Sequence, residues 1–192
     1  MYQVICIGAS WGGLRAVSRL LGDIPETIDQ PIVIAQHRHR DVGGGLAVLL
    51  GEKIRRPVVD VEDKAPIEPR HVYIAPSDYH LLVEPGSFAL NLDERVQYAR
   101  PSIDVLFESA ADAYAEGVIG IILTGANEDG AAGLARIKER GGVAIIQDPR
   151  SAERRTMPDA AIAATVADAV LPLDEIGRFL YGLCVEPTPV RN

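Results

Sequence analysis

Three short apolar runs in this chain are each followed by a residue type that hydrolytic enzymes use. Ser10 follows the first run, in the stretch "VICIGASWGG". His37 and His39 follow the run "IVIAQ", and Glu128 and Asp129 follow the run "GIILTG". A serine hydroxyl becomes a nucleophile when a base takes its proton, imidazole titrates near neutral pH, and a carboxylate can orient that base. These types indicate hydrolysis through a serine triad, and spacing leaves open which histidine and which carboxylate take part.

The residues can act together only if the fold brings the ends of the three runs together. Strand-like apolar runs alternate with helix-like segments, which predicts an α/β fold: a doubly wound, mostly parallel sheet with helices on both faces. The carboxyl ends of parallel strands share one edge of such a sheet, and sites form there. The runs "HVYIA", "YHLLV" and "SFALNL" are closely spaced around turn residues, so they predict an antiparallel hairpin region near residues 71–92.

Boundary signals place the helices between these runs. Pro101 and Ser102 stand near the start of one predicted helix that Gly117 ends, and Gly141 and Gly142 end the helix that follows "TGANEDG". The continuous apolar run "VIGIILTG" between these two helices is typical of a strand buried on both faces. Further helices are expected over residues 12–21, from the glycines at 43–45 to about residue 50, and over 174–184.

Each chemistry-bearing residue also has a purely structural explanation. Ser10 can simply cap the helix that follows it, either carboxylate can do the same in its own loop, and the histidines near residue 37 can be solvated. His71 and His80 belong to the hairpin region and are expected to be structural or surface groups. The joint placement at three predicted strand ends favours the catalytic interpretation of the first set.

A nucleotide-binding fold is the rival explanation of the glycine-rich turn. Gly8, Gly12 and Gly13 do not match G-x-G-x-x-G, because Ser10 stands where the second glycine belongs. The acidic residue expected after the second strand is replaced by "QHRHR", and no G-x-x-x-x-G-K-[ST] motif is present. The turn therefore suits a nucleophile better than a phosphate, and we expect no nucleotide cofactor.

Composition limits the class of protein further. The 192 residues fit a single domain, 1–192, and 47% of them are hydrophobic, enough for a sizeable core. A net charge of −8 argues against non-specific nucleic-acid binding and against docking on anionic lipid. Cys6 and Cys184 form neither a disulfide framework nor a metal motif, and they are expected to be buried reduced thiols. No segment resembles a signal peptide or a membrane span, which predicts a cytoplasmic protein.

Several blocks, in order, resemble the catalytic domain of the chemotaxis protein-glutamate methylesterase (CheB) family. "IGASWGG" is similar to the family's nucleophile turn, and "QH" at residues 36–37 to its histidine loop. "HVYIAPSDYHLLV" and "RPSIDVLFESAA" resemble two further blocks of the family. "GIILTGANEDGAAGL" resembles its aspartate loop, and "GGVAIIQD" and "MPDAAI" resemble its late segments. The resemblance extends from about residue 4 to residue 184.

The resemblance implies roles for individual residues. It makes Ser10 the nucleophile, His37 rather than His39 the base, and Asp129 rather than Glu128 the orienting acid. It also implies an oxyanion site and rim formed by Trp11, Gly12, Gly13, Ala126, Asn127 and Met157. The implied activity is hydrolysis of glutamate γ-methyl esters, and deamidation of glutamines, on the cytoplasmic domain of methyl-accepting chemoreceptors or a similar methylated signalling protein. The family implies no metal and no organic cofactor.

The chain departs from the family pattern around the site. Trp11 stands where the family usually has threonine, and Ala126 with Asn127 replace a methionine and a glycine. Arg38 and His39 replace an apolar residue and proline, and Arg154, Arg155 and Thr156 precede Met157 where the family commonly has "GMP". The usual N-terminal receiver domain has no place before the first strand, so we expect an excised domain, or a stand-alone protein with a separate regulator. An altered rim also leaves a non-catalytic signalling or scaffold module as the alternative function.

Overall fold

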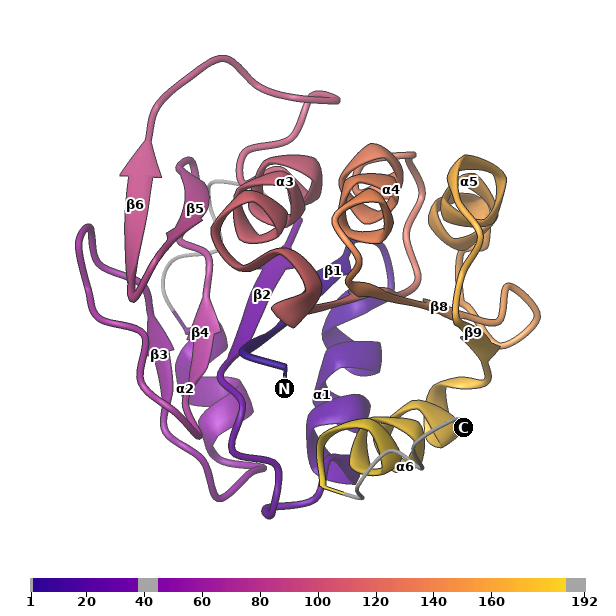
Figure 1. The fold of residues 1–192 in the computed structure, drawn as a ribbon, viewed down its shortest axis with the longest axis horizontal. Helices are drawn as coiled ribbons and strands as arrows, with labels where there is room; N and C mark the ends of the chain where they lie inside the picture. Colours follow the sequence, from indigo (N-terminus) through magenta and orange to yellow (C-terminus); the bar gives the residue numbers. More distant parts are fainter. Residues whose placement is uncertain (1, 38–44, 186–192) are drawn as a thin grey trace.

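A seven-stranded sheet forms the centre of the protein, as seen in a computed structural model that describes residues 2–37 and 45–185 (Figure 1). Its strand order is β3-β4-β2-β1-β7-β8-β9, and every neighbouring pair is parallel. The strands are β1 (Val4–Ala9), β2 (Ile32–Gln36), β3 (Val58–Asp60), β4 (Val72–Ile74), β7 (Val118–Ile122), β8 (Val143–Gln147) and β9 (Ala169–Leu171).

Helices cover both faces of this sheet (Figure 1). One face carries α1 (Gly13–Asp23), α2 (Leu46–Gly51) and α6 (Leu173–Cys184). The other face carries α3 (Ile103–Tyr114), which the short 3₁₀ helix η1 (Ala115–Gly117) extends, together with α4 (Ala131–Glu139) and α5 (Thr156–Ala164). The predicted fold class is therefore confirmed.

The sequence of β1 explains how one sheet has two apolar faces. Val4 and Cys6 belong to the core cluster under α3, whereas Ile5 and Ile7 belong to the cluster under α1. Because successive strand side chains point to opposite faces, an uninterrupted apolar run supplies both cores at once. All four side chains are fully buried, so β1 is fixed in place, and the turn that begins at Ser10 leaves a rigid strand.

The predicted hairpin region was too wide. The antiparallel strands are β5 (His80–Glu84) and β6 (Ser87–Asn91), which form a separate two-stranded sheet. The run at 72–74 instead becomes β4, parallel to both β2 and β3. The close spacing misled the prediction, because residues 61–71 cross from β3 to β4 without a helix, and only a helix would have marked the crossover in the sequence. Helix α5 and strand β9 were not predicted.

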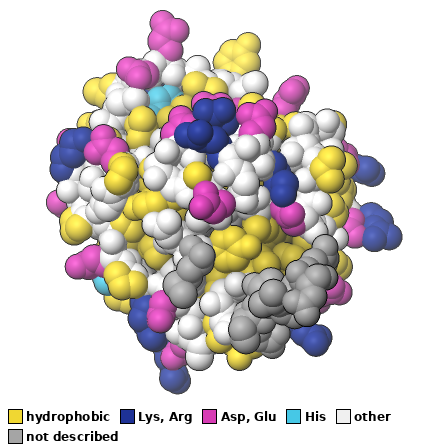
Figure 2. Space-filling model, viewed as in Figure 1, with side chains coloured by type: hydrophobic (Ala, Val, Ile, Leu, Met, Phe, Trp, Pro, Cys, Tyr) yellow, Lys and Arg dark blue, Asp and Glu magenta, His cyan; other side chains and the backbone are white. Residues whose placement is uncertain are grey.

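The central strands β2, β1 and β7 lie side by side, and the chain builds outward from β1 first in one direction and then in the other. Sites of doubly wound folds form at such a switch point, at the carboxyl ends of the strands. Charged side chains of both signs are spread over the face seen in Figure 2, so the net negative charge forms no single patch there. Within residues 2–37 and 45–185, no helix has the length and apolar character that a bilayer crossing requires.

Candidate active site

Ser10, His37 and Asp129 meet at this edge of the sheet. Nδ1 of His37 lies 3.2 Å from the Ser10 hydroxyl oxygen, and Nε2 lies 2.6 Å from Oδ2 of Asp129. An ionised carboxylate only accepts hydrogen bonds, so the proton of the neutral imidazole belongs on Nε2. Nδ1 is then left with a lone pair that faces the serine hydroxyl. The geometry suits transfer of the serine proton to His37.

The strand registers explain why Ser10 and His37 meet. Ala9 pairs with Gln36 at the end of the β1–β2 ladder, so Ser10 and His37 are the next residues past that pair. The backbone N–H of His37 donates to the carbonyl of Ala9 (3.0 Å), and that of Ser10 donates to the carbonyl of Thr124 (3.0 Å). Hydrogen bonding between the strands thus continues into both loops and fixes their first residues.

The amide of Gln36 supports the same two residues. Its Nε2 donates to the carbonyl oxygens of Ser10 (2.8 Å) and His37 (2.9 Å), and the side chain is almost fully buried. Gln36 is therefore a positioning residue for both loops. This role was not predicted from the sequence. The available signal was an amide residue at the end of an apolar run, directly before the histidine.

Asp129 is fully buried and is held by the N-terminus of α3. Its Oδ1 accepts from the hydroxyl of Ser102 (2.8 Å) and the N–H of Asp104 (3.1 Å), and its Oδ2 accepts from the N–H of Ile103 (2.7 Å). Burial by itself would raise the pKa of Asp129, but the hydrogen bonds from His37 and from this backbone outweigh burial and hold the pKa below its ordinary value. Asp129 therefore stays ionised opposite His37.

Asp104, in the first turn of α3, accepts hydrogen bonds from the start of α4. Its Oδ1 accepts from the N–H groups of Gly130 (2.9 Å) and Gly133 (2.7 Å), at the N-terminus of α4. Burial, with the nearby charge of Asp129 as a smaller contribution, raises the pKa of Asp104 to about 6. The starts of α3 and α4 thus hold each other through two carboxylates. From the sequence, Ser102 is predicted only as a helix boundary and Asp104 is given no role, although an acid in the first turn of a capped helix is visible there.

The rim residues expected from the sequence occupy different places. Trp11, Ala126 and Asn127 line a cavity of about 380 Å³ together with Ser10 and His37, and residues 95 and 97–101 form its other wall. Gly12 instead lines a neighbouring hollow, whereas Gly13 is buried against Gln36 and Ala9. Met157 is buried beneath Gly125, whose carbonyl accepts from the N–H of Met157 (3.0 Å), so its side chain does not line this cavity.

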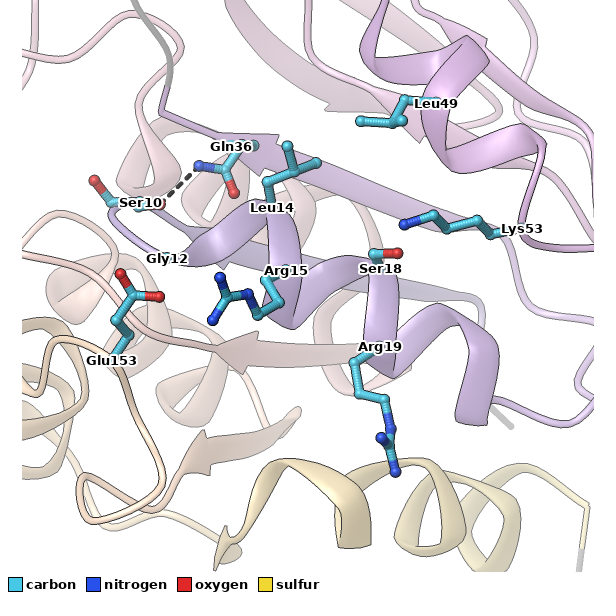
Figure 3. A pocket seen from close by; sticks show the side chains of 10 residues that line it. All are labelled: Ser10, Gly12, Leu14, Arg15, Ser18, Arg19, Gln36, Leu49, Lys53 and Glu153. Atoms are coloured by element: carbon cyan, nitrogen blue, oxygen red, sulfur yellow. Dashed lines mark hydrogen bonds between the residues drawn. The ribbon is translucent and has the colours of Figure 1, made fainter.

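A second, wider hollow runs from Ser10 along the outer face of α1 (Figure 3). Its volume is about 760 Å³, and at its two sides lie Glu153 and Lys53. Although this hollow is larger, His37 lines only the smaller cavity, which therefore contains the reacting groups. The wider hollow is lined by Ser10, Gly12, Leu14, Arg15, Ser18, Arg19, Gln36, Leu49, Lys53 and Glu153.

The other candidate side chains have structural contacts. His80 is buried, its Nε2 bonds to the carbonyl of Glu94, and its Nδ1 accepts from the N–H of Ser102. His71 stacks on Tyr73, and Nδ1 of His71 bonds to the carbonyl of Pro69 (3.0 Å). Arg38 and His39 lie outside the described residues.

The remaining acidic, basic and thiol candidates lie away from the reacting atoms. Glu128 is exposed, and Arg155 pairs with Asp159 on α5 (2.6 Å). Cys6 is a free, buried thiol whose pKa burial raises, and Cys184 is free and partly buried. No cluster of three His, Cys, Asp or Glu side chains in the described ranges is arranged to hold a metal ion.

The chain is similar to known proteins over most of its length. The family model described as CheB methylesterase matches residues 5–180. A Leptospira interrogans protein, assigned to the protein-glutamate methylesterase/protein-glutamine glutaminase group, is 44% identical over 183 residues, covering 95% of each chain. Protein-glutamate methylesterase FrzG of Myxococcus xanthus is 41% identical over 180 residues, which are 93% of this chain and 54% of FrzG. The crystal structure of the Thermotoga maritima CheB methylesterase catalytic domain superposes with a TM-score of 0.90 at 32% identity, over 95% of this chain and 99% of that one.

Proposed function

The chain belongs to the CheB methylesterase family, and from that premise we propose that it hydrolyses the γ-methyl esters of protein glutamate residues, with Ser10 as the nucleophile. The observation that carries the proposal is the continuous contact from Ser10 through His37 to Asp129, at 3.2 Å and 2.6 Å. The family supplies the reaction, and this contact supplies the groups that the reaction needs.

The geometry supports a two-step reaction. Ser10 Oγ attacks the ester carbonyl while His37 Nδ1 takes the hydroxyl proton. Collapse of the tetrahedral intermediate breaks the bond to methoxide, which receives that proton from His37 and leaves as methanol. Water then gives a proton to His37 and attacks the acyl-enzyme, and Ser10 leaves with the proton as the glutamate is released. Asp129 stabilises the imidazolium in both steps.

Backbone N–H groups beside Ser10 suit the oxyanion. The N–H of Trp11 has no acceptor among the described residues, and it lies directly after the nucleophile, two residues before α1 begins at Gly13. The positive end of the α1 dipole favours negative charge at this place. Ala126 lines the same cavity, and its N–H also lacks an acceptor within the described part of the chain. We assign these two N–H groups to the intermediate's oxyanion.

The same attack accounts for a second activity. A glutamine side chain presents a carbonyl with ammonia as the leaving group, so the proton that His37 gives to methoxide would go to the amide nitrogen instead. Relatives carry protein-glutamine glutaminase in their names. The proposed macromolecular substrate is the cytoplasmic domain of a methyl-accepting chemoreceptor or a similar methylated signalling protein, which places the reaction in the cytoplasm.

Methanol release from a methylated chemoreceptor fragment tests the proposal. Ser10→Ala should reduce the rate by several orders of magnitude, because no nucleophile remains. Ser18→Ala is the matched control, since Ser18 is a serine of α1 that does not reach His37. A fluorophosphonate probe should label the wild type and Ser18→Ala at Ser10. Methanol release that persists in Ser10→Ala would contradict the proposal, and an unlabelled, inactive wild type would support a scaffold instead.

A further inference from the structure

Arg154 stacks on Trp11, which lines the active-site cavity. The guanidinium carbon of Arg154 lies 5.4 Å from the centroid of the Trp11 ring, in a cation–π contact. The ring is 58% exposed, and it lines the cavity that contains Ser10 and His37. A large apolar ring left in contact with solvent at a reaction centre is available to a ligand.

The backbone holds this pair in place. The Thr124 hydroxyl is almost fully buried; it donates to the carbonyl of Trp11 (3.0 Å) and accepts from the N–H of Arg154 (2.8 Å). The carbonyl of Arg154 in turn accepts from the N–H of Gly125 (3.1 Å). Thr124, which lies two residues after the end of β7, thus joins two loops that are far apart in the sequence. The backbone of Arg154 is therefore held beside that of Trp11 by the fold.

Arg154 differs from the arginines around it. Arg155, Arg150 and Arg100 each contact a carboxylate, whereas Arg154 has no carboxylate partner among the described residues. Glu153 forms no ion pair with it, and its carboxylate lies against Gly12 at the edge of the wider hollow (Figure 3). A guanidinium that stacks on an aromatic face keeps the N–H groups of its edge free, in a fork that matches a carboxylate.

We propose that Arg154, stacked on Trp11, forms a carboxylate-binding subsite that selects glutamyl esters with a second acidic side chain nearby. The inference rests on the proposed function and names a determinant of its substrate. Trp11 directly follows the nucleophile, so a carboxylate bound at Arg154 belongs to the same substrate segment as the ester. In a helical substrate that side chain lies one turn from the ester, because residues three or four apart are neighbours on a helix surface.

Two peptides test the subsite. Both carry one glutamate γ-methyl ester in a helical sequence, with either Glu or Gln four residues away. The wild type should show a KM about three- to tenfold lower for the Glu peptide, with kcat unchanged, as expected of a partly exposed, charge-assisted pair. Arg154→Gln should abolish this preference, and Arg155→Gln should keep it. Added salt should weaken the preference of the wild type.

The controls separate this subsite from the proposed function. Fluorophosphonate labelling of Ser10 and the thermal midpoint should be unchanged in both arginine variants, which shows an intact triad and fold. Binding of the two peptides to Ser10→Ala provides the same comparison without turnover. Equal affinity for both peptides, or a preference that survives Arg154→Gln, would overturn the subsite. Loss of the preference in Arg155→Gln as well would overturn it too, because general charge would then explain the effect. Methanol release by Ser10→Ala would contradict the proposed function alone.

Discussion

The two sides of Ser10 are built in opposite ways. On the interior side, Asp129 and the first residues of α3, which we call the support, are buried, and both carboxylate oxygens of Asp129 accept hydrogen bonds. On the outer side, Trp11, Arg154 and Tyr98, which we call the rim, are exposed, and Tyr98 is 94% exposed. In the support, both oxygens of Asp129 are occupied by donors, whereas the side chains of Trp11, Arg154 and Tyr98 form no hydrogen bond within the described part of the chain.

The backbone shows the same contrast. Helix N-termini supply the donors of the support, and those donors lie in regular structure. In the rim, Tyr98 lies in a tight turn. Gln97 (φ 49°) and Tyr98 (φ 63°) both adopt the left-handed region there, which costs residues other than glycine about 1 kcal/mol each. We infer that the support fixes the chemistry and the rim selects the substrate. Substitutions in the support should therefore reduce kcat, whereas substitutions in the rim should change KM between substrates.

Among substitutions in the support, replacing Asp129 should have the largest effect on kcat. In Asp129→Asn an amide N–H₂ would face either His37 and the N–H of Ile103, or the donors of Ser102 and Asp104. The imidazole would then lose its orientation and tautomer, and kcat should fall by about 10³- to 10⁴-fold. Methanol release measures this change, and circular dichroism checks the fold.

The neighbouring carboxylate is the control for that experiment. Glu128 is exposed one residue earlier in the same loop. Glu128→Gln should keep its activity within about twofold, since surface substitutions away from contacts have small effects. An equal loss in the two variants would contradict a special role for Asp129 and would remove the distinction between support and surface.

Gly13 offers a smaller change that reaches Ser10 and His37 through packing. A Cβ on Gly13 would collide with Oε1 of Gln36, whose Nε2 holds the carbonyls of Ser10 and His37. Gly13→Ala should therefore displace Gln36 and separate Ser10 from His37, reducing kcat about 10- to 100-fold, because small misplacements in an active site have large effects.

A second glycine of α1 provides the matched variant. A Cβ on Gly22 would meet nothing within 4 Å. Gly22→Ala should leave kcat unchanged and raise the free energy of unfolding by about 0.5–1 kcal/mol, as expected for alanine in a helix. If Gly13→Ala behaved like Gly22→Ala, the proposed positioning role of Gln36 would be wrong. Steady-state kinetics and urea denaturation of both variants make the comparison.

The positions of Ser10 and His37 could be predicted from the sequence, but the residues that hold Asp129 could not. Ser10 and His37 were predictable because each directly follows an apolar run, and parallel strands end at one edge. The preference for His37 over His39 came from family resemblance alone, because spacing treats both alike. Apolar runs in the sequence indicate where strands end, but they do not indicate which side chain of the following loop points into the site.

The contacts of Asp129 were missed for a related reason. Asp129 accepts from residues that precede it by more than twenty positions, and they reach it only because α3 and α4 pack side by side. Periodicity describes one element at a time, so a contact between two helix N-termini leaves no periodic signal. Met157 shows the converse. Its block was recognised, yet its side chain fills the space beneath Gly125 rather than facing the cavity.

Asp104 gives the smallest effect on activity and tests the support by pH. The hydrogen bonds from Gly130 and Gly133 both reach Oδ1 of Asp104, so an asparagine can keep that oxygen in place and remove only the charge. Asp104→Asn should therefore retain activity at pH 7 within about threefold. Asp104→Ala should leave the N–H groups of Gly130 and Gly133 without an acceptor, which costs about 2–4 kcal/mol of unfolding free energy.

The pH dependence of stability follows from the raised pKa of Asp104. Burial, and then the charges of Asp129 and Glu108, raise the pKa to about 6, so the folded protein binds this proton more tightly than the unfolded chain does. The stabilisation is fully present below the ordinary carboxyl pKa of about 4 and is lost as the pH rises through about 6. Asp104→Asn lacks this loss, so its stability relative to the wild type should increase from pH 4 to pH 6 and stay constant above about pH 7. Urea denaturation across this range measures the difference, and a constant difference would show that Asp104 carries no such charge penalty beside Asp129.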